Sequence, residues 1–337
     1  MIGEKENRMG VMPVGKLLFS MSTPMVISFL VQSLYNIVDS IFVARYSPDA
    51  LAAVSLAYPI QILMIAVSVG TGVGVNALLS RLLGEGKKDR AKVTADNAVL
   101  LAIISSIAFA IFGAIGTKAF FDAQTNSDSI RSLGYSYLSI VSIFSFGLIL
   151  EVTYERILQS TGKTIYNMIT QGIGAIINII LDPILIFGLL GAPKMGVAGA
   201  AIATVAGQII AMILSFIFNM KYNEDVDISF GKHIFKPDFI IIKDIYKVGI
   251  PSIAMQSMST LMMLGLNKIL VRYSDMAVNV LGIYYKLQSF VFMPIFGLNN
   301  GMTPIVAYNY GARNKDRILK ALKYSFLSSL VIMVIGT

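Results

Sequence analysis

Cysteine is absent from this 337-residue chain, and histidine occurs once, at His233. Without cysteine there is no disulfide framework and no thiolate metal site. Because a metal site needs several donors, a lone histidine in a polar loop predicts a solvated side chain, and no resident metal is expected. The close glycines of GTGVGVNALLS, 70–80, fall in an apolar run, where they favour tight helix packing over phosphate binding. Transport driven by ATP is therefore not indicated.

Charge is also scarce. Charged residues make up 14% of the chain and hydrophobic residues 55%, with a mean hydropathy of +0.73, outside the usual range of soluble domains. Long, continuously apolar runs of about 20 residues or more indicate an all-α polytopic membrane protein rather than a β-barrel. The nine runs are 17–43, 50–80, 93–117, 133–157, 165–191, 196–220, 245–271, 277–309 and 318–337. Since the ninth reaches the last residue, we expect a truncated copy of a longer protein.

The net charge of +8 is placed in a way that argues against nucleic acid as a partner. Counted from a cytoplasmic N-terminus, 20 of the 27 lysines and arginines fall in loops on one side of the predicted bilayer. The positive-inside rule assigns such loops, and with them the N-terminus, to the cytoplasm. We therefore predict a multi-pass protein of the plasma membrane whose partner is the lipid bilayer.

The chain repeats itself at a constant offset of 227 residues without a gap. The offset pairs Pro24 with Pro251, Arg45-Tyr46-Ser47 with Arg272-Tyr273-Ser274, Gln61 with Gln288, Gly70 with Gly297, Gly74 with Gly301, Gly84 with Gly311, and Lys88-Asp89-Arg90 with Lys315-Asp316-Arg317. Because an even number of predicted helices separates the copies, they are parallel repeats about an axis along the membrane normal. The predicted domains are an N-terminal lobe of six transmembrane helices at 1–220, a cytoplasmic interlobe linker at 221–244, and an incomplete C-terminal lobe of about three helices at 245–337.

Two of the runs carry a polar stripe. Spacings of three and four place Gln32, Asn36 and Asp39 on one face of the first helix, and Gln171, Gly174, Asn178 and Asp182 on one face of the fifth. At about 1.5 Å per residue, Asp39 and Asp182 lie roughly 9 and 13 Å from the outer ends of their helices. We predict that the two carboxylates face the lobe interior and meet at one level.

Three stretches carry a resemblance to a known family. They are SLYNIVDSIFVARYS at 33–47, NIILDP at 178–183 and PIFGLNNGMTPIVAYNYGARNKDR at 294–317. The chain resembles the multidrug and toxic compound extrusion (MATE) family of secondary transporters, specifically its bacterial drug-efflux branch. The resemblance covers the whole chain and implies twelve helices in the complete protein. It also implies an antiporter that exports amphipathic, often cationic drugs by alternating access in exchange for H⁺ or Na⁺, with no other cofactor.

The resemblance further implies an N-lobe cation site. In the family an acid in the first helix joins an Asn and an Asp in the fifth, and these positions match Asp39, Asn178 and Asp182. Gln32 and Asn36 lie on the same stripe as Asp39, so we include them in the predicted cation site. A bound Na⁺ would lie at the two aspartates. A polar residue of the fourth helix, often Asn, also takes part in the family, and Glu155 is the nearest match here.

Other polar residues in the runs are candidates for the substrate cavity. They are Gln61, Glu155, Gln171, Tyr284, Lys286 and Gln288. From their place towards the cytoplasmic end of the fourth helix, Glu151, Glu155 and Arg156 are expected to form a solvated ion pair. Lys286 could pair with an acid, line the cavity or snorkel outward, and these alternatives stay open.

Three alternatives to drug export also stay open. The role of Asp39 and Asp182 could be purely structural, in which case they hold helices together through interhelical hydrogen bonds, each worth about 0.6 kcal/mol. The chain could be a flippase for lipid-linked precursors, which calls for a basic cavity. It could be an intramembrane aspartyl protease, although the contexts IVDS and ILDP do not resemble that class. We favour a transporter over an enzyme and expect a monomer.

Overall fold

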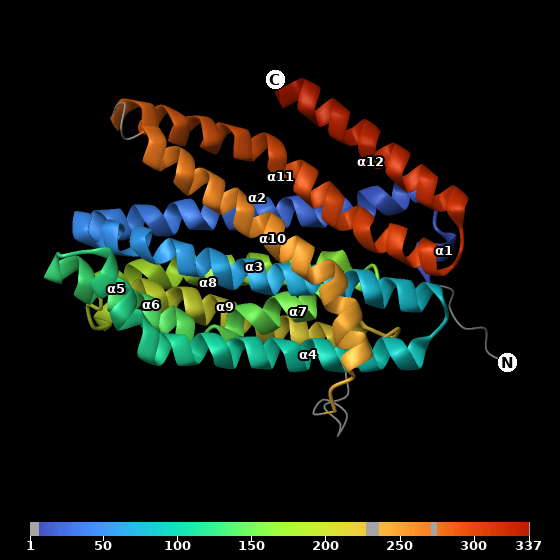
Figure 1. Cartoon of the computed structure of the whole chain (residues 1–337), viewed down its shortest axis with the longest axis horizontal. Helices are drawn as coiled ribbons and strands as arrows, with labels where there is room; N and C mark the ends of the chain where they lie inside the picture. The colour runs from blue at the N-terminus through green and yellow to red at the C-terminus, as the bar shows by residue number, and fades with distance from the viewer. Residues whose placement is uncertain (1–6, 227–235, 271–274, 337) are drawn as a thin grey trace.

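The computed structural model describes residues 7–226, 236–270 and 275–336, which are helical with no strand in this part of the chain (Figure 1). The helices are α1 (Arg8–Val11), α2 (Val14–Tyr46), α3 (Pro48–Gly84), α4 (Lys88–Ile111), α5 (Thr117–Gln124), α6 (Asp128–Ile143), α7 (Phe146–Ser160), α8 (Thr164–Phe187), α9 (Val197–Tyr222), α10 (Phe239–Leu270), α11 (Asp275–Gly311) and α12 (Lys315–Gly336). A π-helical turn, Phe112–Gly116, joins α4 to α5. Each predicted run therefore coincides with a helix or a joined pair.

The polytopic membrane prediction is confirmed. Among the described residues, six helical segments are long and apolar enough to cross a bilayer, and the bent pair of α6 and α7 makes a seventh. The sequence predicted one helix where this pair lies, and the chain bends by 41° between Ile143 and Phe146. At the bend the Ser145 hydroxyl donates to the Ser106 carbonyl of α4 at 3.4 Å, so the bend packs against its neighbour.

One predicted helix end differs from the structure. Helix α8 ends at Phe187 rather than at 191, because Gly188 adopts a left-handed conformation with φ 76° and caps the helix. Asp182 is therefore about 8 Å from its helix end instead of 13, close to the level of Asp39. The region predicted as linker, 221–244, is helical at both ends, since α9 runs to Tyr222 and α10 begins at Phe239. His233 lies outside the described residues.

The N-terminal segment with α1 and the connections from α3 to α4 and from α11 to α12, which the sequence places in the cytoplasm, lie at one end of the bundle, on the right in Figure 1. Asn7 donates to the Asp225 carboxylate at 3.2 Å, and Arg8 donates to the Gly162 carbonyl. Arg317, at the start of α12, donates to the Met9 carbonyl at 2.9 Å. The N-terminal segment thereby ties two loops to the beginning of α12.

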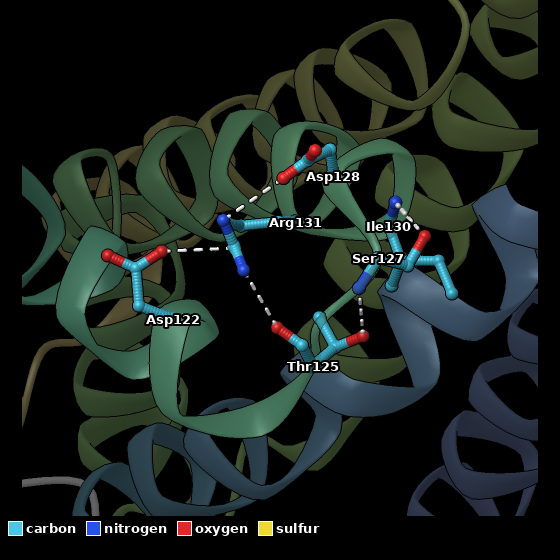
Figure 2. Close-up of polar contacts among 6 residues, drawn as sticks. All are labelled: Asp122, Thr125, Ser127, Asp128, Ile130 and Arg131. Atoms are coloured by element: carbon cyan, nitrogen blue, oxygen red, sulfur yellow. Dashed lines mark hydrogen bonds and ion pairs between the residues drawn. The ribbon is translucent and has the colours of Figure 1, made fainter.

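The opposite end holds few basic residues, and one of them is neutralised locally. Figure 2 shows Arg131 between Asp128 and Asp122, with nitrogen to oxygen distances of 3.1 Å to each carboxylate. Its third contact is a 3.2 Å hydrogen bond to the Thr125 carbonyl, which closes the turn between α5 and α6. The two ends of the bundle thus differ in free positive charge, as the loop count predicts.

The 227-residue repeat is visible in the helix boundaries. The offset carries Pro48 and Gly84, the ends of α3, onto Asp275 and Gly311, the ends of α11. It also carries Lys88, the start of α4, onto the start of α12. Helix α10 packs on α3, and α11 packs on both α2 and α3, so the two copies contact each other.

The glycines of the repeat lie where those helices touch. A Cβ atom added at Gly70 would lie 2.8 Å from the backbone nitrogen of Ile253 on α10. Its repeat mate Gly297 would place a Cβ atom 2.7 Å from the backbone nitrogen of Val26 on α2. Since Val26 and Ile253 are themselves related by the offset, the two contacts are copies of one another.

The same relation holds at the cytoplasmic-loop end of α3 and α11. A Cβ atom at Gly84 would overlap the carbonyl oxygen of Tyr308, and one at Gly311 would overlap that of Arg81. Tyr308 and Arg81 are again repeat mates. Such reciprocal contacts are what an approximate twofold axis between the copies produces. They support the two-lobe architecture, which stays a prediction.

We call the contacts of Gly70, Gly74 and Gly84 and of their repeat mates the glycine seam, and this seam generates a stability prediction. We expect Gly84→Ala to lower the free energy of unfolding by about 1–3 kcal/mol, because the added methyl group forces α3 and α11 apart. Denaturation of the purified protein in detergent measures the change. Gly172→Ala is the matched control, since nothing lies within 4 Å of a Cβ atom there. Equal stability of the two variants would contradict the role of the seam.

Candidate functional site

Asp39 on α2 and Asp182 on α8 lie side by side between two packed helices. Asp182 is fully buried and Asp39 partly buried. Their carboxyl groups are close enough to interact with each other. No other described residue donates a hydrogen bond to either Asp182 oxygen or to Asp39 Oδ1. Because a carboxylate has no proton to donate, the two groups can bond only through a shared proton or a cation.

Asn178 lies one turn before Asp182 on α8. Its Nδ2 donates to Thr204 Oγ1 on α9 at 3.2 Å, while its buried Oδ1 receives no hydrogen bond. The two helices approach closely here, because a Cβ atom at Gly207 would lie 2.7 Å from the Gly174 carbonyl oxygen. The predicted stripe of α8 therefore faces its neighbours, and Thr204 joins it from α9.

A small cavity opens beside this group of residues. Its volume is about 70 Å³, and it lies between α2, α7, α8 and α9. The lining residues are Gln32, Tyr35, Leu148, Glu151, Val152, Glu155, Gln171, Gly174, Ala175, Asn178, Thr204, Gly207 and Gln208. Several water molecules or a partly hydrated ion would fit, whereas drug-sized ligands occupy pockets of roughly 300–1,000 Å³.

The structure corrects the prediction of a solvated ion pair on α7. Glu151, Glu155 and Arg156 are only 8%, 5% and 7% exposed. The Glu155 carboxylate accepts hydrogen bonds from Thr170 Oγ1 at 2.8 Å and from Gln171 Nε2 at 2.7 Å. The prediction failed because four helices, α3, α4, α8 and α9, cover α7 on several sides. They separate these three side chains from the membrane–water interface.

Arg156 does not donate to either glutamate. Its Nη1 donates to Gln159 Oε1 and to Asn300 Oδ1 of α11, and Gln159 Nε2 donates to the Asn300 carbonyl. The side chain passes over Gly72 of α3, where an added Cβ atom would lie 2.7 Å from Arg156 Cγ. Arg156 thus connects α7 to the C-terminal helices while its charge still acts on Glu155.

Two tyrosines lie near the acidic groups. Tyr35 on α2 lines the cavity and feels the charges of Glu151, Asp39 and Asp182. Tyr137 on α6 lies near Asp39 and accepts a hydrogen bond from Gln61 Nε2 at 3.0 Å. The sequence singled out Gln61 but missed both tyrosines. Tyr35 lies three residues after Gln32, so a stripe search that admitted tyrosine would have found it.

The remaining candidates are not brought to this site. Asn36 and Tyr284 are exposed, and Gln288 is partly buried on α11. The side chain of Lys286 lies outside the described part of the chain. Gln32 and Gln171 do join the cavity, Gln171 through its bond to Glu155.

Two stretches of the chain, 24–184 and 251–337, match the family model MatE. The chain belongs to the MatE family. The multidrug export protein MepA of Staphylococcus aureus, strain NCTC 8325 / PS 47, is 30% identical over 96% of this chain and 70% of its own length. A protein named FAD transporter from Shewanella oneidensis is 28% identical over 95% of this chain and 70% of its own length.

Solved structures of the family have the same fold. An outward-facing multidrug resistance MATE transporter of the MOP superfamily has a TM-score of 0.90 at 26% identity, over 99% of this chain and 73% of that one. A MOP superfamily transporter from Pyrococcus furiosus, described as having a binding pocket of reverse polarity, has a TM-score of 0.85 at 26% identity, with the same coverage of both chains. This MatE protein is therefore a multi-pass plasma-membrane transporter related to multidrug efflux proteins, and the protease alternative is excluded.

The buried position of Arg156 leads to a testable prediction about stability. We expect Arg156→Ala to lower the free energy of unfolding by about 3–5 kcal/mol, because Glu155 loses the positive charge that acts on it in a buried setting. Thermal or chemical denaturation of the detergent-solubilised protein measures it. Arg81→Ala is the control, since the exposed pair of Arg81 and Glu85 contributes about 0–1 kcal/mol. Adding Glu155→Gln to Arg156→Ala should restore part of the loss, and no restoration would contradict this explanation.

Proposed function

We propose that this MatE protein exports amphipathic, often cationic compounds in exchange for H⁺ or Na⁺, with Asp39 and Asp182 as the coupling carboxylates. The observation that carries the proposal is the closeness of two carboxyl groups, three of whose four oxygens receive no hydrogen bond from a described residue. The multidrug export activity in the name of MepA, at 30% identity, supports the substrate class.

The coupling step is a competition for the space between the carboxylates. With a proton or Na⁺ bound there, α2 and α8 can stay in close contact, since the like charges are neutralised. Without it, two negative charges face each other in a medium of low dielectric and push the helices apart. The ion thereby stabilises one packing of α2 over another, which is how a ligand shifts a conformational equilibrium.

For Na⁺, the ligands would be oxygen atoms of this group. Hard cations prefer carboxylate and carbonyl oxygens. The Asn178 amide oxygen is buried without a donor one turn from Asp182, so it can complete the set. Asp39, Asp182 and Asn178 are the residues that would hold the ion.

The polarity of the small cavity beside the coupling carboxylates favours a positively charged group, such as the head of a cationic substrate, over a negatively charged one. Glu151 and Glu155 line it, and no lysine or arginine does so among the described residues. A flippase for lipid-linked precursors, like a carrier of the phosphate-bearing FAD, would need positive charge there. The acidic lining is therefore the observation against these two alternatives.

The orientation and state of assembly are part of the proposal. The basic loops and the N-terminal segment share one end of the bundle, so we place this end in the cytoplasm and the bilayer around the helices of a monomer. A reporter fused near Lys232 should be cytoplasmic and one near Gln124 external. The opposite pattern would overturn the orientation.

Substitution of the coupling carboxylates tests the mechanism. We expect Asp39→Asn and Asp182→Asn each to abolish ion-driven drug efflux, because the neutral amide no longer changes charge when the ion leaves. Efflux is measured in proteoliposomes with a pH gradient and a Na⁺ gradient imposed separately, which also identifies the ion. Asp49→Asn, at an exposed carboxylate that bonds Ser129, is the matched control. Gradient-driven efflux at the unaltered rate in both coupling variants would exclude this role.

A further inference from the structure

A basic pocket lies where α3 passes into α4 and α11 passes into α12, at the right-hand end of the bundle in Figure 1. Its volume is about 730 Å³, and it shares no residue with the small cavity beside the coupling carboxylates. Four of its side chains are basic and one is acidic, which leaves an excess of three positive charges. The lining residues are Arg81, Glu85, Lys87, Tyr310, Gly311, Arg313, Lys315 and Ile318.

The single carboxylate of the pocket is already engaged on the side of α3. Glu85 pairs with Arg81 at 2.8 Å and with Lys87 at 2.6 Å. The Arg81 guanidinium also lies over the ring of Tyr310 on α11, 5.7 Å from the ring centroid. Because Glu85 takes up the Nε proton of Arg81, the terminal nitrogens of this guanidinium can donate to a ligand.

The side of α11 and α12 contributes two basic residues with no such partner. Arg313 and Lys315 form no ion pair with any residue in the ranges that the structure describes. Both are exposed, so water solvates them in the free protein. The two halves of the pocket therefore differ: one is partly neutralised by Glu85, and the other carries uncompensated positive charge.

Arg313 occupies a backbone conformation that suits glycine. Its φ is 56°, and the 227-residue offset pairs it with Gly86, whose φ is 72°. The two connections thus make the same turn, once with glycine and once with arginine. A side chain makes a left-handed conformation costly, and such strain is retained where the side chain serves a function. The cost at Arg313 adds a guanidinium to the pocket.

We propose that this pocket binds a phosphate-bearing anion. Phosphate oxygens accept several charge-assisted hydrogen bonds at once, and guanidinium groups match their geometry. Two sources offer this chemistry at the end of a transmembrane bundle, namely the head group of an anionic phospholipid and a soluble phosphate ester. Because both copies of the repeat line the pocket, a bound phosphate would hold the Gly84–Gly311 contact of the glycine seam together. Neither the coupling ion nor the transported compound enters this proposal.

Thermal unfolding of the whole chain in lipid nanodiscs tests the pocket, in a buffer without phosphate. In one arm the lipid is phosphatidylcholine, and glycerol 3-phosphate is titrated at constant Na⁺ concentration and ionic strength. In the other arm phosphatidylglycerol replaces phosphatidylcholine stepwise, with no soluble ester present. We expect a saturable rise of the unfolding midpoint in at least one arm, since a ligand that binds only the folded protein stabilises it.

Arg313→Gly decides whether the pocket is responsible. The change removes the guanidinium and installs the residue that the matching turn already uses, so the midpoint without ligand should not fall. We expect the apparent affinity for the ester, or the phosphatidylglycerol fraction that gives half of the shift, to worsen about tenfold. Lys320→Gln is the matched control, because Lys320 is an exposed cation of α12 outside the pocket. It should leave the affinity within about twofold.

The two arms distinguish the sources. A response to glycerol 3-phosphate alone assigns the pocket to a soluble phosphate ester, and a response to phosphatidylglycerol assigns it to a lipid head group. No saturable response in either arm overturns the proposal. Equal losses of affinity in Arg313→Gly and Lys320→Gln also overturn it, because they would reflect general surface charge. None of these measurements involves transport, so their failure is distinguishable from a failure of coupled efflux.

Discussion

Contact between helix backbones at glycine residues is the constraint on which this molecule depends. Gly70 and Gly84 let α3 approach α10 and α11, and their mates Gly297 and Gly311 let α11 approach α2 and α3. In a membrane there is no hydrophobic gain from bringing apolar helices together, so close packing of small residues has to supply the attraction. The repeat makes the same contact twice, with the roles of the two copies exchanged. These contacts join the two copies where α3 and α11 pack against each other.

The functional groups depend on this packing for their environment. Gly72 leaves room for Arg156 to cross from α7 to Asn300 on α11, and Gly207 lets α9 press Thr204 against α8. These contacts help to keep Glu155, Arg156 and Asp182 buried. A carboxylate in such a setting must bind a proton or a cation or pay a large desolvation cost. The close packing at Gly72 and Gly207 therefore gives these side chains a buried environment in which their charge matters.

Much of this could be predicted from the sequence. The nine helical segments follow from the length of the apolar runs, and the proximity of Asp39 and Asp182 follows from stripe spacing and depth. The burial of Glu151, Glu155 and Arg156 could not be predicted, because position along a helix says nothing about which neighbours cover it. Thr204 was missed for a related reason, since it gains its place only from the helix that packs beside it, whereas Tyr35 was missed because tyrosine was not counted in the polar stripe.

The sequence by itself determined the membrane class, the repeat and the identity of the acids, because these depend on composition and on periodic spacing along one chain. The tertiary structure alone decided which donors reach which acids. Glu155 is satisfied by Thr170 and Gln171, whereas both oxygens of Asp182 are left without a donor. Hydrogen bonding acts over about 3 Å between separate helices, and such distances are set by packing rather than by the order of residues.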